Sequence, residues 1–141
     1  MTKTSKQAQS DIIALLKGSI LDTSTSGDIY RGMPDSSYRP RDSRKEDIVV
    51  IFTTGIPSEV ETGVVTIQIY VPDITPYEDG VFVEDGRRTE EVEALADKWV
   101  NSLTCDRSNY KFKLQQSIHT QANTDVHQHF VVVRLGYSLY E

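Results

Sequence analysis

Two long stretches of alternating apolar and polar side chains constrain the fold of this chain more than any other feature. In residues 62–71 the apolar side chains fall on every second position, and residues 127–140 repeat this spacing. A period of two places one set of side chains on each face of a β-strand. The sequence therefore predicts two strands, each buried on one face. Further apolar runs at 48–52 and 110–118 predict two more strands.

Two amphipathic helices accompany the strands. Apolar side chains recur at helical spacing in residues 5–20, with Gly18 near the end of the run. A second helix is predicted to begin at Thr89, whose hydroxyl suits an N-cap, and to carry glutamates in its first turn, where the helix dipole favours them. Its apolar stripe predicts a buried face with the single tryptophan in the core. The stripe consists of Val92, Leu95, Ala96, Trp99 and Leu103.

The predicted elements follow one another as α-β-β-α-β-β. A glycine-containing connection allows 48–52 and 62–71 to form an antiparallel hairpin, and a turn at 122–125 allows the same for the last two strands. Two hairpins that each follow a helix predict an α+β fold, with an antiparallel four-stranded sheet packed on one face by two helices. A very short strand at 28–30 is a further expectation. The length and the uniform composition indicate a single domain, residues 1–141.

The charge balance and the cysteine count argue against several classes of function. The chain has 15 basic and 21 acidic residues, and its net charge of -6 repels a nucleic-acid backbone, which argues against a dedicated DNA or RNA binder. The single Cys105 gives no intramolecular disulfide and no zinc finger, as suits a reducing compartment. The apolar run at 12–16 is too short for a signal peptide, and no run approaches the ~18 residues that cross a bilayer. We therefore expect synthesis inside the cell and no membrane partner.

One cluster of side chains has the composition of a metal site. It consists of His119, Asp125, His127 and His129, which a hairpin turn brings together. The alternative is that these are ordinary polar residues near the end of a hairpin, and the sequence favours it because no further carboxylate completes a catalytic site. The chain also has no phosphate-binding glycine loop and no serine elbow. We expect no metal, no cofactor and no enzymatic activity.

Two charged segments and three tyrosines are candidates for binding a partner. Residues 34–47 are polar and are predicted to form a long exposed loop, either solvated or in contact with a partner. Residues 73–88 are predicted to form an acidic loop or a small projecting hairpin. Tyr70, Tyr137 and Tyr140 belong either to the core or to an interface, where tyrosine is enriched. The charged candidates are Arg39, Arg41, Arg44 and Lys45 in the first segment and Asp73, Glu78, Asp79, Glu84 and Asp85 in the second.

Several segments of the chain share their order and hydrophobic pattern with a known family. They are the helix at 8–20, the passage GDIYRGMP at 27–34 with the strand at 48–52, the strand VTIQIYV at 65–71, the passage GRRTE at 86–90 with the following Ala94, Leu95 and Ala96, and the strand RLGYSL at 134–139. In this layout the chain resembles the phage tail-completion and tail-terminator proteins. The resemblance covers nearly the whole chain and rests on pattern, because no catalytic or ligand motif is part of it.

The resemblance implies a structural subunit that forms a six-fold ring at the end of the tail tube, stops its growth and joins the tail to the head. The implied partners are further copies of the chain, tail-tube proteins and neck proteins, with DNA only passing through the lumen of the ring. The implied location is the tail or neck of a virion whose proteins are made in the host bacterial cytoplasm. Another neck, connector or tail-tube protein, a bacterial protein-binding adaptor and a histidine-dependent metalloenzyme are the alternatives.

The two charged segments depart from the family pattern because both are longer than it suggests. By analogy, the resemblance places contacts with ring neighbours or with tube and neck proteins in the segments at 39–45 and 73–85. Their opposite charges suit a head-to-tail contact between subunits around a ring.

Overall fold

The structure is a computed structural model of the chain. Cys105, Asp125 and Tyr140, which the sequence singles out, lie outside the residues that it describes. None of the helices in the described ranges combines the length and the apolar character needed to cross a bilayer. The described residues are 4–33, 36–56, 60–103, 110–123 and 126–139.

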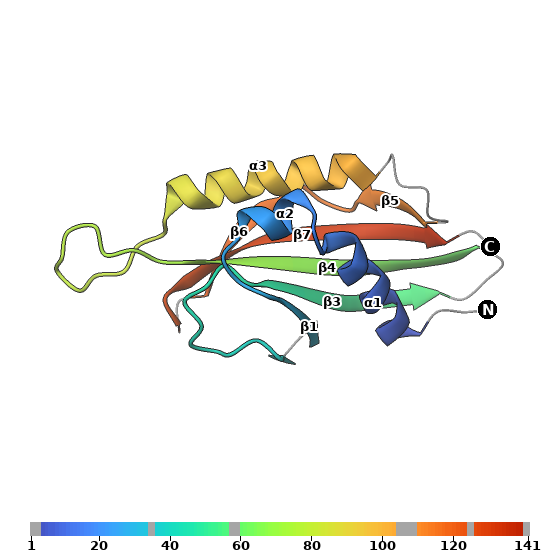
Figure 1. The fold of residues 1–141 in the computed structure, drawn as a ribbon, viewed down its shortest axis with the longest axis horizontal. Coiled ribbons are helices and arrows are strands. Elements are labelled where there is room, and N and C mark those ends of the chain that lie inside the picture. Colours follow the sequence, from blue (N-terminus) through green and yellow to red (C-terminus); the bar gives the residue numbers. More distant parts are fainter. Residues whose placement is uncertain (1–3, 34–35, 57–59, 104–109, 124–125, 140–141) are drawn as a thin grey trace.

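A mixed β-sheet forms the scaffold of the molecule (Figure 1). Its two longest strands, β4 (Glu61–Pro72) and β7 (Gln128–Leu139), pair antiparallel along their whole length. These are the two stretches with the clearest alternation in the sequence, and one face of each is buried. In the described part of the chain the remaining strands are β1 (Ile29–Met33), β2 (Ser36–Ser37), β3 (Ile48–Ile56), β5 (Tyr110–Leu114) and β6 (His119–Asn123), and the order across the sheet is β2-β1-β3-β4-β7-β5, with β6 also on β7.

The expectation of a purely antiparallel, four-stranded sheet in the order α-β-β-α-β-β is only partly right. The fold is α+β, β3 and β4 form the expected antiparallel hairpin, and the short strand expected at 28–30 is present as β1. However, β1 pairs parallel with β3, because residues 36–47 carry the chain back to the starting end of β1 before β3 begins. The sheet is therefore mixed and wider than predicted.

The prediction of one strand at 110–118 is only partly right: β5 ends at Leu114, and a second strand, β6, begins at His119, beyond the predicted range. β5 pairs with the C-terminal half of β7, and β6 pairs with its N-terminal half. The chain bends at Gln115 and Gln116 between them, so both short strands lie along the same edge of β7. This division leaves the side chains of β5 at one end of the molecule and those of β6 at the other.

The helices differ from their predicted bounds at three points. The helix predicted at 5–20 is two helices, α1 (Ser5–Leu16) and α2 (Ile20–Ser24), because Gly18 adopts φ +75° and Ser19 caps a new helix. The third helix, α3 (Gly86–Ser102), begins before Thr89, and Asp85 is its N-cap. Thr89 is buried in the first turn, where its hydroxyl donates to the Glu84 carboxylate.

All three helices pack on one face of the sheet, and the core lies between these two layers (Figure 1). Trp99 is almost fully buried, as its helix stripe predicts. The helix layer contributes Ile12, Leu16, Leu21, Val92, Ala96 and Trp99, and the sheet contributes Ile48, Val50, Val65, Ile67, Ile69, Val131, Val133 and Leu135. The opposite face of the sheet carries no helix within the described residues, and it is called the open face below.

Candidate assembly surfaces

Residues 73–85 leave the body of the molecule as a projecting arm (Figure 1). Ile74 and Val83 form a single antiparallel bridge with two backbone hydrogen bonds of 2.9 Å, and residues 75–82 form a loop beyond it. Its tip turns at Glu78 and Gly80, which both adopt positive φ. The segment thus combines features of the two predicted forms, an acidic loop that projects and that one antiparallel bridge closes at its base.

The arm concentrates exposed apolar side chains. Of the nine large hydrophobic residues that are exposed in the described chain, five belong to it, and Tyr77 at the tip is 81% exposed. Scattered single apolar residues are normal on a protein surface, whereas a cluster on one projection marks a site of interaction. The five are Ile74, Tyr77, Val81, Phe82 and Val83.

The acidic residues of the arm fall into two groups. Near its base, the Asp73 carboxylate lies 2.6 Å from Nδ1 of His129, and Asp85 accepts a hydrogen bond from the backbone N–H of Arg88. At the tip, Glu78 and Asp79 are exposed, and Asp79 also accepts from the backbone N–H of Val81. The base carboxylates fix the arm to the body, and the tip carboxylates face solvent.

Ring stacking and an arginine also hold the base. The ring of Phe82 stacks on His127 with 3.9 Å between centroids, and the Arg44 guanidinium lies 6.0 Å from the Phe82 centroid. Arg44 donates to the backbone carbonyls of Val126, His127 and Asp73. Two of the candidate segments, one basic and one acidic, are therefore in contact within the same molecule.

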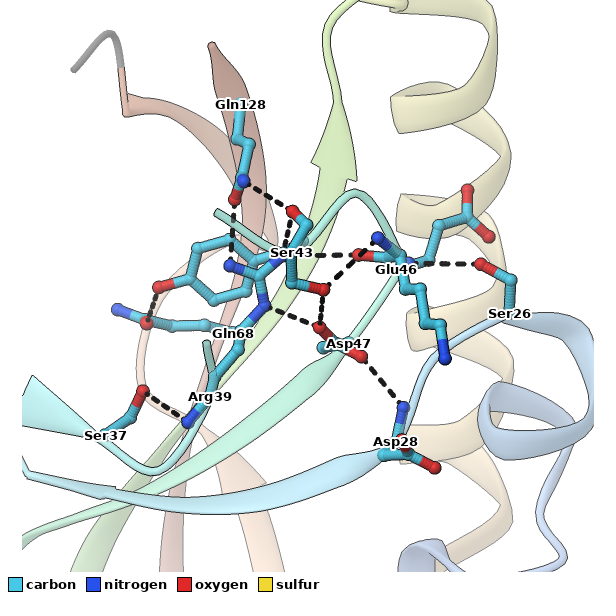
Figure 2. Close-up of polar contacts among 11 residues, drawn as sticks. Ser26, Asp28, Ser37, Arg39, Ser43, Glu46, Asp47, Gln68 and Gln128 are labelled. Carbon is cyan, nitrogen blue, oxygen red and sulfur yellow. Dashed lines mark hydrogen bonds and ion pairs between the residues drawn. The ribbon is translucent and has the colours of Figure 1, made fainter. Parts of the chain in front are cut away.

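Arg39 lies at the centre of a buried polar network (Figure 2). Its guanidinium pairs with the Asp47 carboxylate at 2.8 Å, donates to the Gln128 side chain at 2.9 Å and lies 4.0 Å from the ring centroid of Tyr70. Asp47 is fully buried and also accepts from the hydroxyl of Ser43 and the backbone N–H of Asp28. A buried charge needs such partners. The network pins residues 36–47 to the sheet.

The prediction of an exposed loop at 34–47 is therefore wrong for part of the segment. Arg39 and Asp47 are buried, because each neutralises the other and the neighbouring amides satisfy their remaining hydrogen-bonding groups. Arg41, Arg44 and Lys45 are exposed. Of the four basic candidates, Arg39 has an internal role, and the other three lie at the surface.

Two hollows lie on the open face of the sheet. One, of about 420 Å³, is next to the buried network and is lined by Arg41, Tyr70 and Phe130 among others. The other, of about 510 Å³, lies at the far end of the sheet, and we call it the terminal groove. Exposed lysines from β5 and apolar side chains from β3 and β4 line it together. Its lining includes Thr54, Ile56, Thr62, Val64, Lys111 and Lys113.

The tyrosine candidates occupy different layers. Tyr70 lies on the open face, half-buried under Arg39, and its hydroxyl donates to Gln68. Tyr137 belongs to the core cluster and is only 4% exposed, and burial raises the pKa of its phenol. Its ring fills the space over Gly63, where an added Cβ would lie 2.5 Å from it. Tyr140 lies outside the described residues.

The three histidines do not converge. His119 on the open face bonds to Ser117 and Gln121, His127 stacks on Phe82, and His129 pairs with Asp73. Adjacent side chains along a strand point to opposite faces of the sheet, so the register of β6 with β7 separates His119 from His129. Within the described residues no group of three or more histidine, cysteine or acidic side chains has the spacing of a metal site.

The exposed apolar residues of these surfaces were not predicted from the sequence. Tyr77 and Ile56 are 81% and 62% exposed, but apolar residues in a sequence are normally assigned to the core. Lys111 and Lys113 alternate with apolar residues in the segment where the sequence predicts a strand. The sequence does not show that the ends of β3 and β4 lie beside these lysines and complete the terminal groove.

Comparisons with known proteins identify no family. No family model matches the chain, and no curated protein matches it. Eleven chains among the solved structures match. One of them, whose name describes no function, is 15% identical, and the match covers 79% of each chain with a TM-score of 0.40. A similarity at that level carries no argument about function.

Proposed function

We propose that this chain is a structural assembly subunit, a phage tail-terminator or tail-completion protein whose copies form a ring at the end of a tail tube and join the tail to the head. The observation that supports the assembly role is the arm, residues 73–85, whose exposed apolar side chains project beyond the Ile74–Val83 bridge. Such a cluster is costly in water and is stabilised when a partner covers it.

The open face of the sheet offers two hollows as further surface for contact with a partner. The phage-specific part of the proposal rests on the resemblance in element order, together with the acidic character of the chain. A net charge of -6 keeps DNA from adhering to a ring through which it passes.

Imaging of the purified full-length chain tests the proposal. Negative-stain micrographs at increasing protein concentration are expected to show closed rings with a central hole and one fixed number of subunits. Addition of purified tail tubes should place these rings at tube ends. A chain that remains monomeric at every concentration, both alone and with tubes, contradicts the proposal and favours an adaptor that needs a different partner.

A further inference from the structure

We propose that the arm of one copy of the chain docks into the terminal groove of the next copy. This inference rests on the proposed function and deepens it, since it names the two surfaces that join neighbouring subunits. The arm is residues 73–85, and the terminal groove is the hollow of about 510 Å³ between the ends of β3, β4, β5 and β7. The occupant of the groove is thus a second copy of this chain.

The chemistry of the two surfaces is complementary. The arm carries five acidic residues and no basic one, and its exposed tip combines Tyr77 with Glu78 and Asp79. The groove presents Lys111 and Lys113, both exposed. An acidic projection and a basic groove attract each other and fix their register.

Apolar surface is available on both sides of the contact. In the groove, Ile56 is 62% exposed and lies beside the half-buried Val64. On the arm, Tyr77 and Val81 are 81% and 56% exposed. Aromatic side chains that fill a pocket commonly supply most of the energy of a protein interface. The lysines therefore steer the arm, and the apolar contacts hold it.

The positions of the two surfaces fit a contact that propagates. Figure 1 shows the arm at one end of the long axis, and the strand ends that form the groove at the opposite end. A surface at one end that binds a different surface at the other end makes a head-to-tail contact. Repetition of such a contact closes into a ring when the rotation between subunits allows it.

The other hollow of the open face, of about 420 Å³, matches the arm of a neighbouring copy less well than the terminal groove does. Arg39 in its lining already donates to Asp47, Gln128 and two backbone carbonyls, and Arg41 is the exposed cation of this hollow. The terminal groove presents the exposed Lys113 and has more apolar surface in its lining. The observations therefore favour the terminal groove.

A charge swap tests the docking contact. Glu78→Lys and Lys113→Glu, each made alone in the full-length chain, should weaken self-association about tenfold, since each places like charges together. The double variant restores attraction between the arm of one copy and the groove of the next, so its dissociation constant should return to within about threefold of the wild-type value. Sedimentation velocity across a concentration series gives these constants.

Matched substitutions on α3 serve as controls. Asp97→Lys and Lys98→Glu make the same charge changes on exposed positions outside both surfaces and should leave association unchanged. Circular dichroism checks that each variant is folded. If the wild-type chain associates but the single swaps have no effect, or the double variant does not recover, the docking inference fails while the assembly role stands. A wild-type chain that never associates overturns both.

Discussion

Arg39 and Arg41 are two positions apart in the sequence and have different structural roles. The Arg39 guanidinium neutralises the fully buried Asp47, whereas Arg41 is exposed. Removing one partner of a buried pair leaves an uncompensated charge, so Arg39→Ala should lower the free energy of unfolding by about 3 to 5 kcal/mol. Arg41→Ala is the matched control and should change it by less than about 0.5 kcal/mol. Urea denaturation measures both, and equal effects would contradict the role of the network.

Removal of the hydroxyl group should affect stability differently at two buried tyrosines, Tyr110 and Tyr137. The Tyr110 hydroxyl donates to Asp11 at 2.7 Å, whereas within the described residues the Tyr137 hydroxyl is buried without a hydrogen-bond partner. Tyr110→Phe should therefore destabilise the chain by about 1 to 2 kcal/mol, and Tyr137→Phe should leave stability unchanged or raise it by up to about 1 kcal/mol. Thermal unfolding of the two variants in parallel measures the contrast. A larger loss for Tyr137→Phe would mean that its hydroxyl has a partner.

The same two phenols predict how stability depends on alkaline pH. Burial, and for Tyr110 also the hydrogen bond to Asp11, raises the pKa of each phenol above that of free tyrosine. A raised pKa in the folded state means that the contribution to stability is complete below about pH 10 and falls as the pH rises beyond it. The free energy of unfolding should decline above pH 10, and less steeply in Tyr110→Phe. An unchanged slope in that variant would contradict this assignment.

At the scale of elements, local pattern determined what could be predicted. β4, β7 and α3 each have a clear period and one buried face, and the sequence located all three. The direction of β1 was not predictable, because it depends on the path of residues 36–47 and on a buried Arg39–Asp47 pair that no local spacing reveals. The end of α1 was visible as Gly18, but the capped restart as α2 was not.

The sequence shows which residues of the candidate assembly surfaces are charged. It does not show which of their side chains are exposed. The acidic residues of the arm and the basic residues at 39–45 stand out in the sequence. Whether a charge is buried and paired, as for Arg39, or exposed, as for Glu78, depends on what lies opposite it in space. For the same reason the exposed tip residue Tyr77 was not identified as a contact residue.

The arm predicts a pattern of limited proteolysis. Tyr77 lies in an exposed turn, where cleavage concentrates, and it is 81% exposed. Chymotrypsin should cleave after Tyr77 rapidly at low protein concentration and at least about tenfold more slowly under assembling conditions, because docking covers the tip. Tyr38, which is 78% exposed outside both proposed surfaces, is the internal control and should be cleaved at the same rate in both conditions. Unchanged cleavage at Tyr77 would mean that assembly leaves the arm uncovered.

At the scale of the whole molecule, the arm and the body have separable tasks. The core lies between the helices and one face of the sheet, and the arm contributes no residue to it. The Ile74–Val83 bridge closes the arm near its base. Replacement of residues 75–82 by Gly-Gly therefore shortens the arm while the body retains its core. Such a variant should fold like the wild-type chain and lack its means of self-association.

The solution mass of this shortened variant, measured by light scattering beside the wild-type chain across one concentration series, tests the assembly role most directly. The wild-type mass should rise to a plateau at a fixed multiple of the subunit mass. The shortened variant should stay at the subunit mass with an unchanged circular dichroism spectrum. A folded variant that reaches the same plateau as the wild-type chain would contradict the claim that the arm joins the subunits.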